Sequence, residues 1–266
     1  MIGTPTPLPV LERGAGPTLL FLHGYPLHRA MWNPQLDSLS DHCRVLLADL
    51  PGFGTASDHA VPDTLAGFAR AVETTVESRV GGPVTVVAHS FGGYIALQLY
   101  RDRPDLFERL VLVSTRSEAD APEARAKRLA TAERLGNPSE RLDVDAAAHP
   151  LLSEQSRTGR PRVVEAVRAM VAAAPNRAMV GALRAIANRP DLTPVLASIR
   201  VPTLVVWGAQ DELMPPARTQ ALREGVVGSK GVEIAGAGHM SPLEDPPSFD
   251  RAVRDFLAAT EERRST

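Results

Sequence analysis

The sequence has a single cysteine, Cys43, among 266 residues, so no disulfide can form within the chain. Because Cys43 comes just before an apolar segment, we expect a buried structural thiol rather than a reactive one. The net charge is only −2 at pH 7, which gives no electrostatic case for a nucleic-acid or membrane-surface partner. The composition therefore argues against a disulfide-stabilised scaffold and against a basic, nucleic-acid-binding chain.

Long apolar runs are also lacking. No stretch approaches the length of a membrane-spanning helix, and the N-terminus has neither the charged segment nor the apolar segment of a signal peptide. We therefore expect a cytoplasmic protein with no membrane partner. What the chain does have is 44% hydrophobic residues, enough for a substantial core, and a length that suits one large α/β domain or a core with an inserted piece.

Short apolar runs alternate with helical patterns in the first and last parts of the chain. Runs that are apolar on both faces are typical of central strands in a sheet that helices cover on both sides. This alternation predicts an α/β fold with a doubly wound, mostly parallel sheet. The expected strands are 8–11 at one edge, then 18–22, 44–48, 83–88, 110–113, 202–207 and 232–234; the expected helices include 30–39, 63–80, 91–103, 216–225 and 249–259.

The alternation stops in the middle of the chain. Residues 116–191 carry no strand pattern, and prolines divide them into about four helical segments. We interpret them as an inserted helical cap over the end of the sheet, with residues 1–115 and 192–266 forming the core. The alternative is a helical appendage with no role at a site.

One strand ends in a distinctive turn. An apolar run leads into Ala88, His89, Ser90, Phe91 and Gly92, after which a helical pattern begins. A turn this tight requires small residues two before and two after the serine, and Ala88 and Gly92 meet that requirement. The turn would lift the Ser90 hydroxyl out of the sheet, beside the first N–H groups of the following helix, which can stabilise an oxyanion.

Other polar residues follow the remaining strands. In sheets of this type the ligand site lies at the carboxyl ends of the strands, so these residues are expected to converge. In chain order they are 23–25 (His-Gly-Tyr), Asp49, Ser90, 114–116, Asp211 and His239.

These motifs, in this order, resemble the α/β-hydrolase superfamily over essentially the full chain. The matching segments are 23–26, 49–54, the Ser90 turn, 208–211 and 238–239. Ala88 stands where the common pattern has glycine. The cap, especially residues 116–135, is similar to that of bacterial hydrolases related to 3-oxoadipate enol-lactonases. The resemblance therefore implies the α/β-hydrolase fold and a serine carboxylesterase or lactonase branch.

The chemistry of such a site assigns three roles. Ser90 is a weak nucleophile until a base takes its proton, and His239 can do so through one ring nitrogen. Asp211 would hold the other ring N–H and stabilise the imidazolium. Asp49, Glu118 and Asp120 are the alternative acids. By resemblance, the oxyanion would be bound by the backbone N–H groups of Tyr25 and Phe91.

Residues beside these loops suggest a largely apolar substrate pocket. Arg116 would lie at its rim, where it meets either a substrate carboxylate or the neighbouring Glu118 or Asp120. The expected pocket residues are Trp32, Arg116, Met214, Met240 and Leu243, with the Phe91 ring beside them.

The sequence thus predicts a serine hydrolase that cleaves small carboxylic esters or lactones through an acyl-enzyme. A serine nucleophile argues against dehalogenase and epoxide-hydrolase chemistry, which needs a carboxylate at this turn. Two alternatives remain open: a perhydrolase or haloperoxidase-like activity of the same triad, and a non-hydrolytic small-molecule receptor. We expect a small-molecule substrate, no cofactor and no metal; a homodimer is left open.

Overall fold

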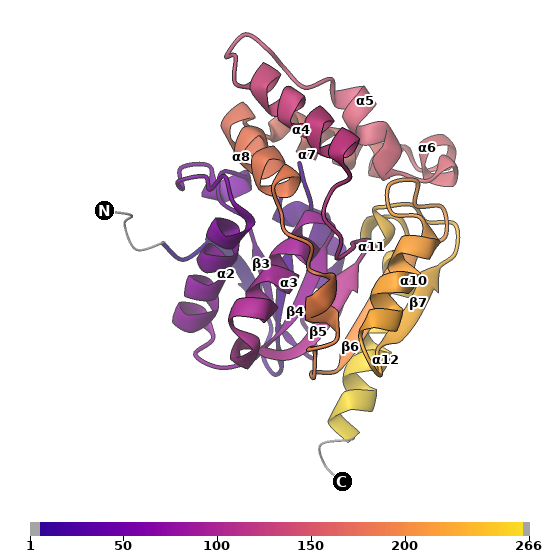
Figure 1. Ribbon diagram of the computed structural model, residues 1–266. Helices are drawn as coiled ribbons and strands as arrows, with labels where there is room; N and C mark the ends of the chain where they lie inside the picture. Colours follow the sequence, from indigo (N-terminus) through magenta and orange to yellow (C-terminus); the bar gives the residue numbers. More distant parts are fainter. Residues whose placement is uncertain (1–5, 263–266) are drawn as a thin grey trace.

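The computed structural model describes residues 6–262, and its centre is a seven-stranded sheet in the order β1-β3-β2-β4-β5-β6-β7 (Figure 1). Only the edge strand β1 is antiparallel to its neighbour; the other pairs are parallel. The predicted mostly parallel sheet is confirmed. The strands are β1 Val10–Arg13, β2 Thr18–Leu22, β3 Arg44–Ala48, β4 Val84–His89, β5 Phe107–Val113, β6 Thr203–Gly208 and β7 Lys230–Ile234.

Both faces of the sheet are buried, because successive side chains of a strand point to opposite faces. In β2, Leu20 and Leu22 pack into one hydrophobic cluster while Leu19 and Phe21 pack into the other. Each central strand must therefore be apolar at every position, which is why the strands were recognisable as continuous apolar runs.

Helices supply the other half of each cluster. Apolar side chains of α2, α3, α9 and α10 share the cluster of Leu20, whereas those of α1 and α12 share the cluster of Phe21. The helices and 3-10 turns of the described chain are η1 Arg29–Trp32, α1 Asn33–Leu39, η2 Gly54–Ala56, α2 Leu65–Arg79, α3 Phe91–Asp102, η3 Pro104–Leu106, α4 Pro122–Leu135, α5 Val144–Ala148, η4 His149–Leu151, α6 Glu154–Gly159, α7 Pro161–Ala173, α8 Asn176–Ala187, α9 Thr193–Leu196, α10 Pro216–Gly225, α11 Ser241–Glu244 and α12 Pro246–Glu262.

The helical cap is inserted between β5 and β6, and helices α4 to α8 lie together above the sheet (Figure 1). Helix α4 packs on α8, and α5 packs on α7. Residues 116–191 contain no strand, in agreement with their pattern. The exact division into a core and a cap at 115/116 and 191/192 stays a prediction.

Several expected boundaries differ from the structure, and two of the differences have a clear physical reason. The edge strand begins at Val10 rather than at Leu8, because the Leu8 N–H donates to the hydroxyl of Thr75 instead of joining the sheet. The last helix begins at Pro246, earlier than expected, since proline is well tolerated in the first turn of a helix. Within residues 6–262 no helix is long and apolar enough to cross a membrane.

Candidate active site

Ser90 lies between β4 and α3 with φ 50° and ψ −109°, a conformation that costs energy in a non-glycine residue. Hydrogen bonds from the neighbouring strand hold it there. The Ser90 N–H donates to the carbonyl oxygen of Val113, 2.9 Å away, and the hydroxyl of Thr115 donates to the Ser90 carbonyl oxygen over 2.8 Å. The end of β5 therefore fixes the strained turn at the end of β4.

The turn requires glycine at two close approaches. A Cβ atom at Gly92 would lie 2.7 Å from the carbonyl oxygen of Leu22, so only glycine lets α3 start this close to β2. A Cβ atom at Gly24 would lie 3.3 Å from the Cβ atom of Ser90. The turn that carries Tyr25 is thus adjacent to Ser90. Phe91 is the first residue of α3, where a backbone N–H has no acceptor within its own helix.

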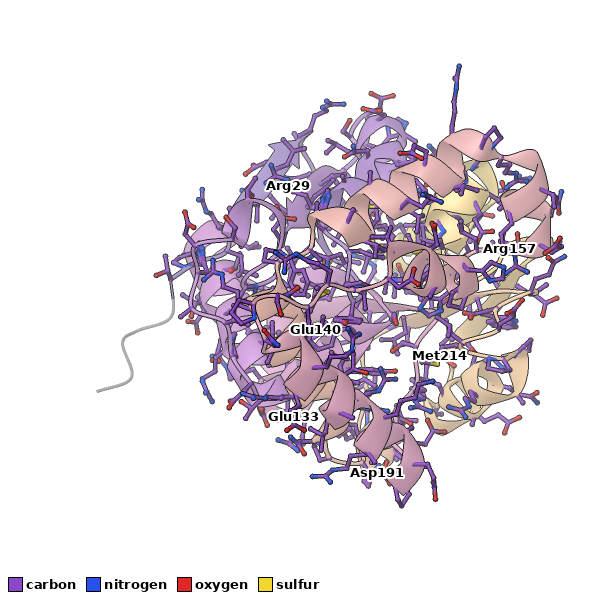
Figure 2. The ribbon with its side chains drawn as sticks, turned by 90° about the horizontal axis from the view of Figure 1, so that it is seen from above. Arg29, Glu133, Glu140, Arg157, Asp191 and Met214 are labelled. Atoms are coloured by element: carbon purple, nitrogen blue, oxygen red, sulfur yellow. The ribbon has the colours of Figure 1, made fainter. Side chains whose placement is uncertain are left out.

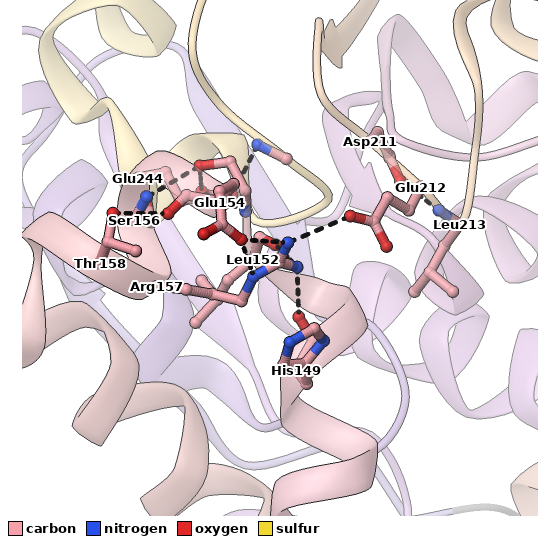
Figure 3. Close-up of polar contacts among 12 residues, drawn as sticks. His149, Leu152, Glu154, Ser156, Arg157, Thr158, Asp211, Glu212, Leu213 and Glu244 are labelled. Atoms are coloured by element: carbon pink, nitrogen blue, oxygen red, sulfur yellow. Dashed lines mark hydrogen bonds and ion pairs between the residues drawn. The ribbon is translucent and has the colours of Figure 1, made fainter.

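His239 and Asp211 form a buried pair. Nδ1 of His239 lies 2.9 Å from Oδ2 of Asp211. The other carboxylate oxygen of Asp211 accepts from the backbone N–H of Leu213 at 2.9 Å (Figure 3). It also accepts from the backbone N–H of Met214 at 2.8 Å. Burial by itself would raise the pKa of Asp211, but the facing imidazole and these hydrogen bonds outweigh it and hold the pKa below its ordinary value.

The charged carboxylate determines which nitrogen of His239 carries a proton. An ionised carboxylate only accepts hydrogen bonds, so Nδ1 is the donor and Nε2 is the basic nitrogen in the neutral ring. His239 and Ser90 both line one cavity of about 520 Å³. The arrangement provides a hydroxyl and an oriented imidazole at the same cavity wall.

The cavity lies between core and cap. The core contributes Met214 and Arg218, and the cap contributes Arg128, Leu151 and Leu183. Seen from above, Met214 lies between the cap segments that carry Glu133 and Arg157 (Figure 2). Of the residues expected at the site, Tyr25, Ser90, Phe91, Arg116, Met214 and His239 line this cavity.

Three expected pocket residues lie elsewhere, and the prediction is corrected for them. Trp32 is fully buried, and its ring packs on Phe21 and Phe249 at centroid distances of 5.0 and 5.9 Å. Met240 is fully buried in the same hydrophobic cluster, and Leu243 is half-buried and packs against it. These residues are close to the site along the chain, but their side chains face the core, and proximity along the chain does not determine which way a side chain faces.

Arg116 lines the cavity and is also paired, as one of the two expectations had it. Its Nη2 atom lies 2.5 Å from Oδ1 of Asp120. Arg128 and Arg189 bind the same carboxylate at 2.8 and 3.0 Å. Burial alone would raise the pKa of Asp120, but these arginines outweigh it and lower the pKa. Asp120 thus holds three arginines, whereas Asp211 is the acid that contacts His239.

Asp49, another alternative acid, stabilises a loop. Its carboxylate accepts from the N–H of Arg29 at 2.7 Å and from the N–H and hydroxyl of Thr55, both at 2.8 Å. His23 belongs to the same corner of the fold. Its Nε2 accepts from the N–H of Leu50 at 2.9 Å, so Nδ1 is the donor to the carbonyl oxygen of Gly24. Both residues connect the turn of Tyr25 to the loop after β3.

Glu244, which no motif in the sequence marks, joins the His239 loop to the cap. One carboxylate oxygen of Glu244 accepts from the N–H of Gly238 at 2.8 Å. The other accepts from the N–H and the hydroxyl of Ser153, at 2.9 and 2.6 Å. No sequence signal marked Glu244, because its partners are far apart in the chain. Its side chain therefore joins the loop that carries His239 to the start of α6 through hydrogen bonds.

A second polar connection runs from the cap to the loop of Asp211 (Figure 3). Arg157 on α6 binds Glu154 at 2.8 Å and donates to the carbonyl oxygens of Leu152 and His149. Its guanidinium also lies 3.3 Å from the carboxylate of Glu212, the residue after Asp211. The cap is therefore held to both loops that carry the buried pair.

The chain is similar to characterised proteins over most of its length. The chain is 31% identical to the dihydrolipoyllysine-residue acetyltransferase component of an acetoin cleaving system from Cupriavidus necator, over 92% of this chain; it spans 64% of that protein's length. It is 29% identical to a pimeloyl-[acyl-carrier protein] methyl ester esterase from Stenotrophomonas maltophilia, over 92% of this chain and 94% of that one.

Solved structures are similar over nearly the whole fold. A thermophilic esterase from Thermogutta terrifontis, solved with malate bound, is 32% identical, with a TM-score of 0.89 over 95% of this chain and 93% of its own. The enol-lactonase of Burkholderia xenovorans is 25% identical, with a TM-score of 0.86 over 94% of this chain and 96% of its own. The predicted resemblance and the predicted class, a carboxylic ester hydrolase, are confirmed by these relatives.

A family model described as the alpha/beta hydrolase fold matches residues 17–246. That span runs from the start of β2 to the beginning of α12 and so includes the Ser90 turn, the whole cap and the His239 loop. The chain belongs to the alpha/beta hydrolase fold family.

Proposed function

We propose that the protein is a serine hydrolase that cleaves carboxylic esters or lactones of small molecules through an acyl-enzyme. The observation that carries this proposal is the His239–Asp211 pair, 2.9 Å between Nδ1 and Oδ2, at a cavity that Ser90 also lines. A cavity of about 520 Å³ with mostly apolar walls suits a small organic substrate.

In the first half of the reaction, Nε2 of His239 takes the proton of Ser90 as the hydroxyl oxygen attacks the ester carbonyl carbon. The new C–O bond converts the carbonyl oxygen to an oxyanion, and the N–H groups of Tyr25 and Phe91 are the proposed donors to it. The tetrahedral intermediate then expels the alkoxide, which takes the proton from Nε2. Asp211 stabilises the imidazolium between these two transfers.

In the second half, water attacks the acyl-enzyme. His239 accepts the proton of the water, the oxyanion forms again in the same place, and Ser90 leaves as the hydroxyl after Nε2 returns the proton. One ester and one water give one acid and one alcohol. For a lactone the alcohol and the acid remain in one molecule, which leaves only after the second half.

Two of the relatives support this choice of reaction by their names, one a methyl ester esterase and the other an enol-lactonase. Their substrates differ in size and in the kind of ester bond. The shared chemistry is acyl transfer from an oxygen leaving group to water, so the proposal stays at carboxylic esters and lactones.

The test is labelling of the protein with a fluorophosphonate, read by intact mass, together with turnover of p-nitrophenyl esters and simple lactones. We expect one adduct on the wild type and none on Ser90→Ala, with hydrolysis lowered by roughly three to six orders of magnitude in the variant. An unlabelled wild type that hydrolyses neither class of substrate would contradict the proposal. Hydrolysis that persists in Ser90→Ala would contradict the assigned nucleophile.

A further inference from the structure

The walls of the cavity carry charge of one sign. Four of its lining residues are cationic, Arg116, Lys127, Arg128 and Arg218, and no Asp or Glu is among the lining residues that the structure describes. The chain as a whole has a net charge of −2. The positive charge at the cavity is therefore a local concentration and does not reflect a basic protein.

Two of these cations are paired with a carboxylate within the fold. Arg116 and Arg128 share the buried carboxylate of Asp120 with Arg189, which also stacks on the ring of Tyr94, with 4.3 Å from its guanidinium carbon to the ring centroid. One carboxylate thus faces three arginines, and this cluster keeps a net positive charge next to the cavity.

The other two have no such partner. Across residues 6–262, no carboxylate lies within ion-pair distance of Lys127 or Arg218, and neither side chain forms a hydrogen bond with another described residue. Lys127 is on α4 of the cap and Arg218 is on α10 of the core, and both are exposed while lining the cavity. They therefore stand at its open side, on opposite structural units.

The remaining walls near these cations are apolar, with Leu151, Leu183, Ile186 and Met214 among them. Several cations gathered above low-dielectric walls attract anions and raise the local concentration of those anions. A neutral alkyl ester would leave both charges without a counter-ion, whereas a carboxylate on the far end of an alkyl chain would pair with them while the chain packs on the apolar wall.

We propose that Lys127 and Arg218 bind a carboxylate of the substrate, so that the preferred substrates are monoesters of dicarboxylic acids, or lactones that bear a free carboxylate, with the ester bond at Ser90. This inference rests on the proposed function, because it names the substrate class of the same site. It assigns a specificity role to two residues that take no part in the acyl transfer.

The test compares matched pairs of substrates that differ only in the terminal group. The mono-p-nitrophenyl esters of adipic, suberic and sebacic acid carry a terminal carboxylate; p-nitrophenyl hexanoate, octanoate and decanoate carry a methyl group instead. For the wild type, at one chain length or more, we expect kcat/KM for the carboxylate-bearing ester to be at least about tenfold higher than for the matched neutral ester. This difference should shrink at high salt, because salt screens the cations.

The variants are Lys127→Gln, Arg218→Gln and the double variant. We expect the ratio of kcat/KM for the acid to kcat/KM for the matched neutral ester to fall to about one in the double variant. Lys127→Arg, which keeps the charge, should retain most of the preference. The control is the double variant Arg125→Gln/Arg223→Gln, which changes the same charge on the same two helices at residues outside the cavity lining.

The outcomes separate this inference from the proposed function. Efficient hydrolysis of neutral esters with no preference for the acids, or a preference that survives in the double variant, would overturn the inference and leave the hydrolase standing. If the protein hydrolyses nothing, calorimetry of adipamate against hexanamide still decides. Tighter binding of adipamate that the double variant loses supports the carboxylate site, and equal binding of the two amides overturns it.

Discussion

The side chain of His89 donates from Nε2 to the backbone carbonyl oxygen of His239, 2.8 Å away. The residue directly before Ser90 is thereby bound to the residue that faces Asp211. Since Nε2 is the donor, Nδ1 is unprotonated in the neutral ring, and it is the atom closest to a Cβ placed at Gly24, at 2.5 Å. One buried ring thus contacts the turn of Tyr25 and the loop of His239 together.

His89 is buried as a neutral ring, because a second proton would lie on Nδ1, which has no hydrogen-bond partner among the described residues. Burial, with the nearby His239 as a lesser cause, lowers the pKa of His89 to about 3. Burial likewise lowers the pKa of His23 to about 4. Both rings take up protons near pH 6.5 in the unfolded chain. The unfolded state therefore binds more protons below that pH, and the contribution to stability is complete above about 6.5 and is lost as the pH falls towards the folded values.

We accordingly expect the free energy of unfolding to fall, between about pH 6 and pH 4, by about 1.4 kcal/mol per pH unit for each histidine, and so by about 2.8 kcal/mol per pH unit for the two together. Urea unfolding at a series of pH values measures this slope. In His89→Gln, whose amide can still donate a hydrogen bond, the slope should decrease by about 1.4 kcal/mol per pH unit, the contribution of one titrating group. His42→Gln, at an exposed histidine, is the control; an unchanged slope in His89→Gln would refute the assignment.

Asp211→Asn tests the acid of the proposed triad. The amide keeps the size of the side chain but removes the charge that stabilises the imidazolium and that makes Nδ1 the donor. We expect kcat to fall by on the order of 10³–10⁴ with little change in KM. Glu212→Gln is the control, because it removes the same charge at the next residue. Glu212 is exposed and forms a surface ion pair with Arg157 at 3.3 Å, so kcat of this variant should stay within about twofold of wild type. Similar losses in the two variants would contradict the assignment.

Glu244→Ala tests the connection between the cap and the His239 loop. Its removal leaves the N–H groups of Gly238 and Ser153 and the hydroxyl of Ser153 without their acceptor in a buried place. We expect a loss of about 2–4 kcal/mol in the free energy of unfolding, and a lower kcat because the loop next to His239 is released. Glu154→Ala, at a carboxylate that is 70% exposed, should cost under about 1 kcal/mol. Equal stability of the two variants would show that Glu244 is not an anchor.

Trp32 and Met214 distinguish core from cavity. Trp32→Ala removes a fully buried ring that packs on Phe21 and Phe249, so we expect a loss of about 3–5 kcal/mol in stability. KM for esters should remain unchanged in the fraction that is folded. Met214→Ala should instead change KM, since Met214 lines the cavity. Thermal unfolding and steady-state kinetics on both variants check this. An altered KM in Trp32→Ala would indicate that Trp32 belongs to the substrate pocket after all.

Patterns that are local in the sequence anticipated much of this protein. The apolar runs predict the first and last residues of β2 and β3 as the structure has them, because a strand buried on both faces must be apolar throughout. The Ser90 turn was recognisable because its backbone geometry demands small neighbours within two residues. The same is true of the proline-punctuated cap, since helix boundaries depend on nearby residues.

The tertiary structure decided what depends on direction and on distant partners. It buries Trp32 and Met240 in the core and packs Leu243 against it. It also pairs Asp120 with three arginines and leaves Lys127 and Arg218 unpaired at the cavity. A sequence shows which residues are charged or apolar, but it does not show which of them find a partner. Pairing depends on tertiary packing, which brings the hydroxyl of Ser153 in the cap to 2.6 Å from the carboxylate of Glu244 in the core.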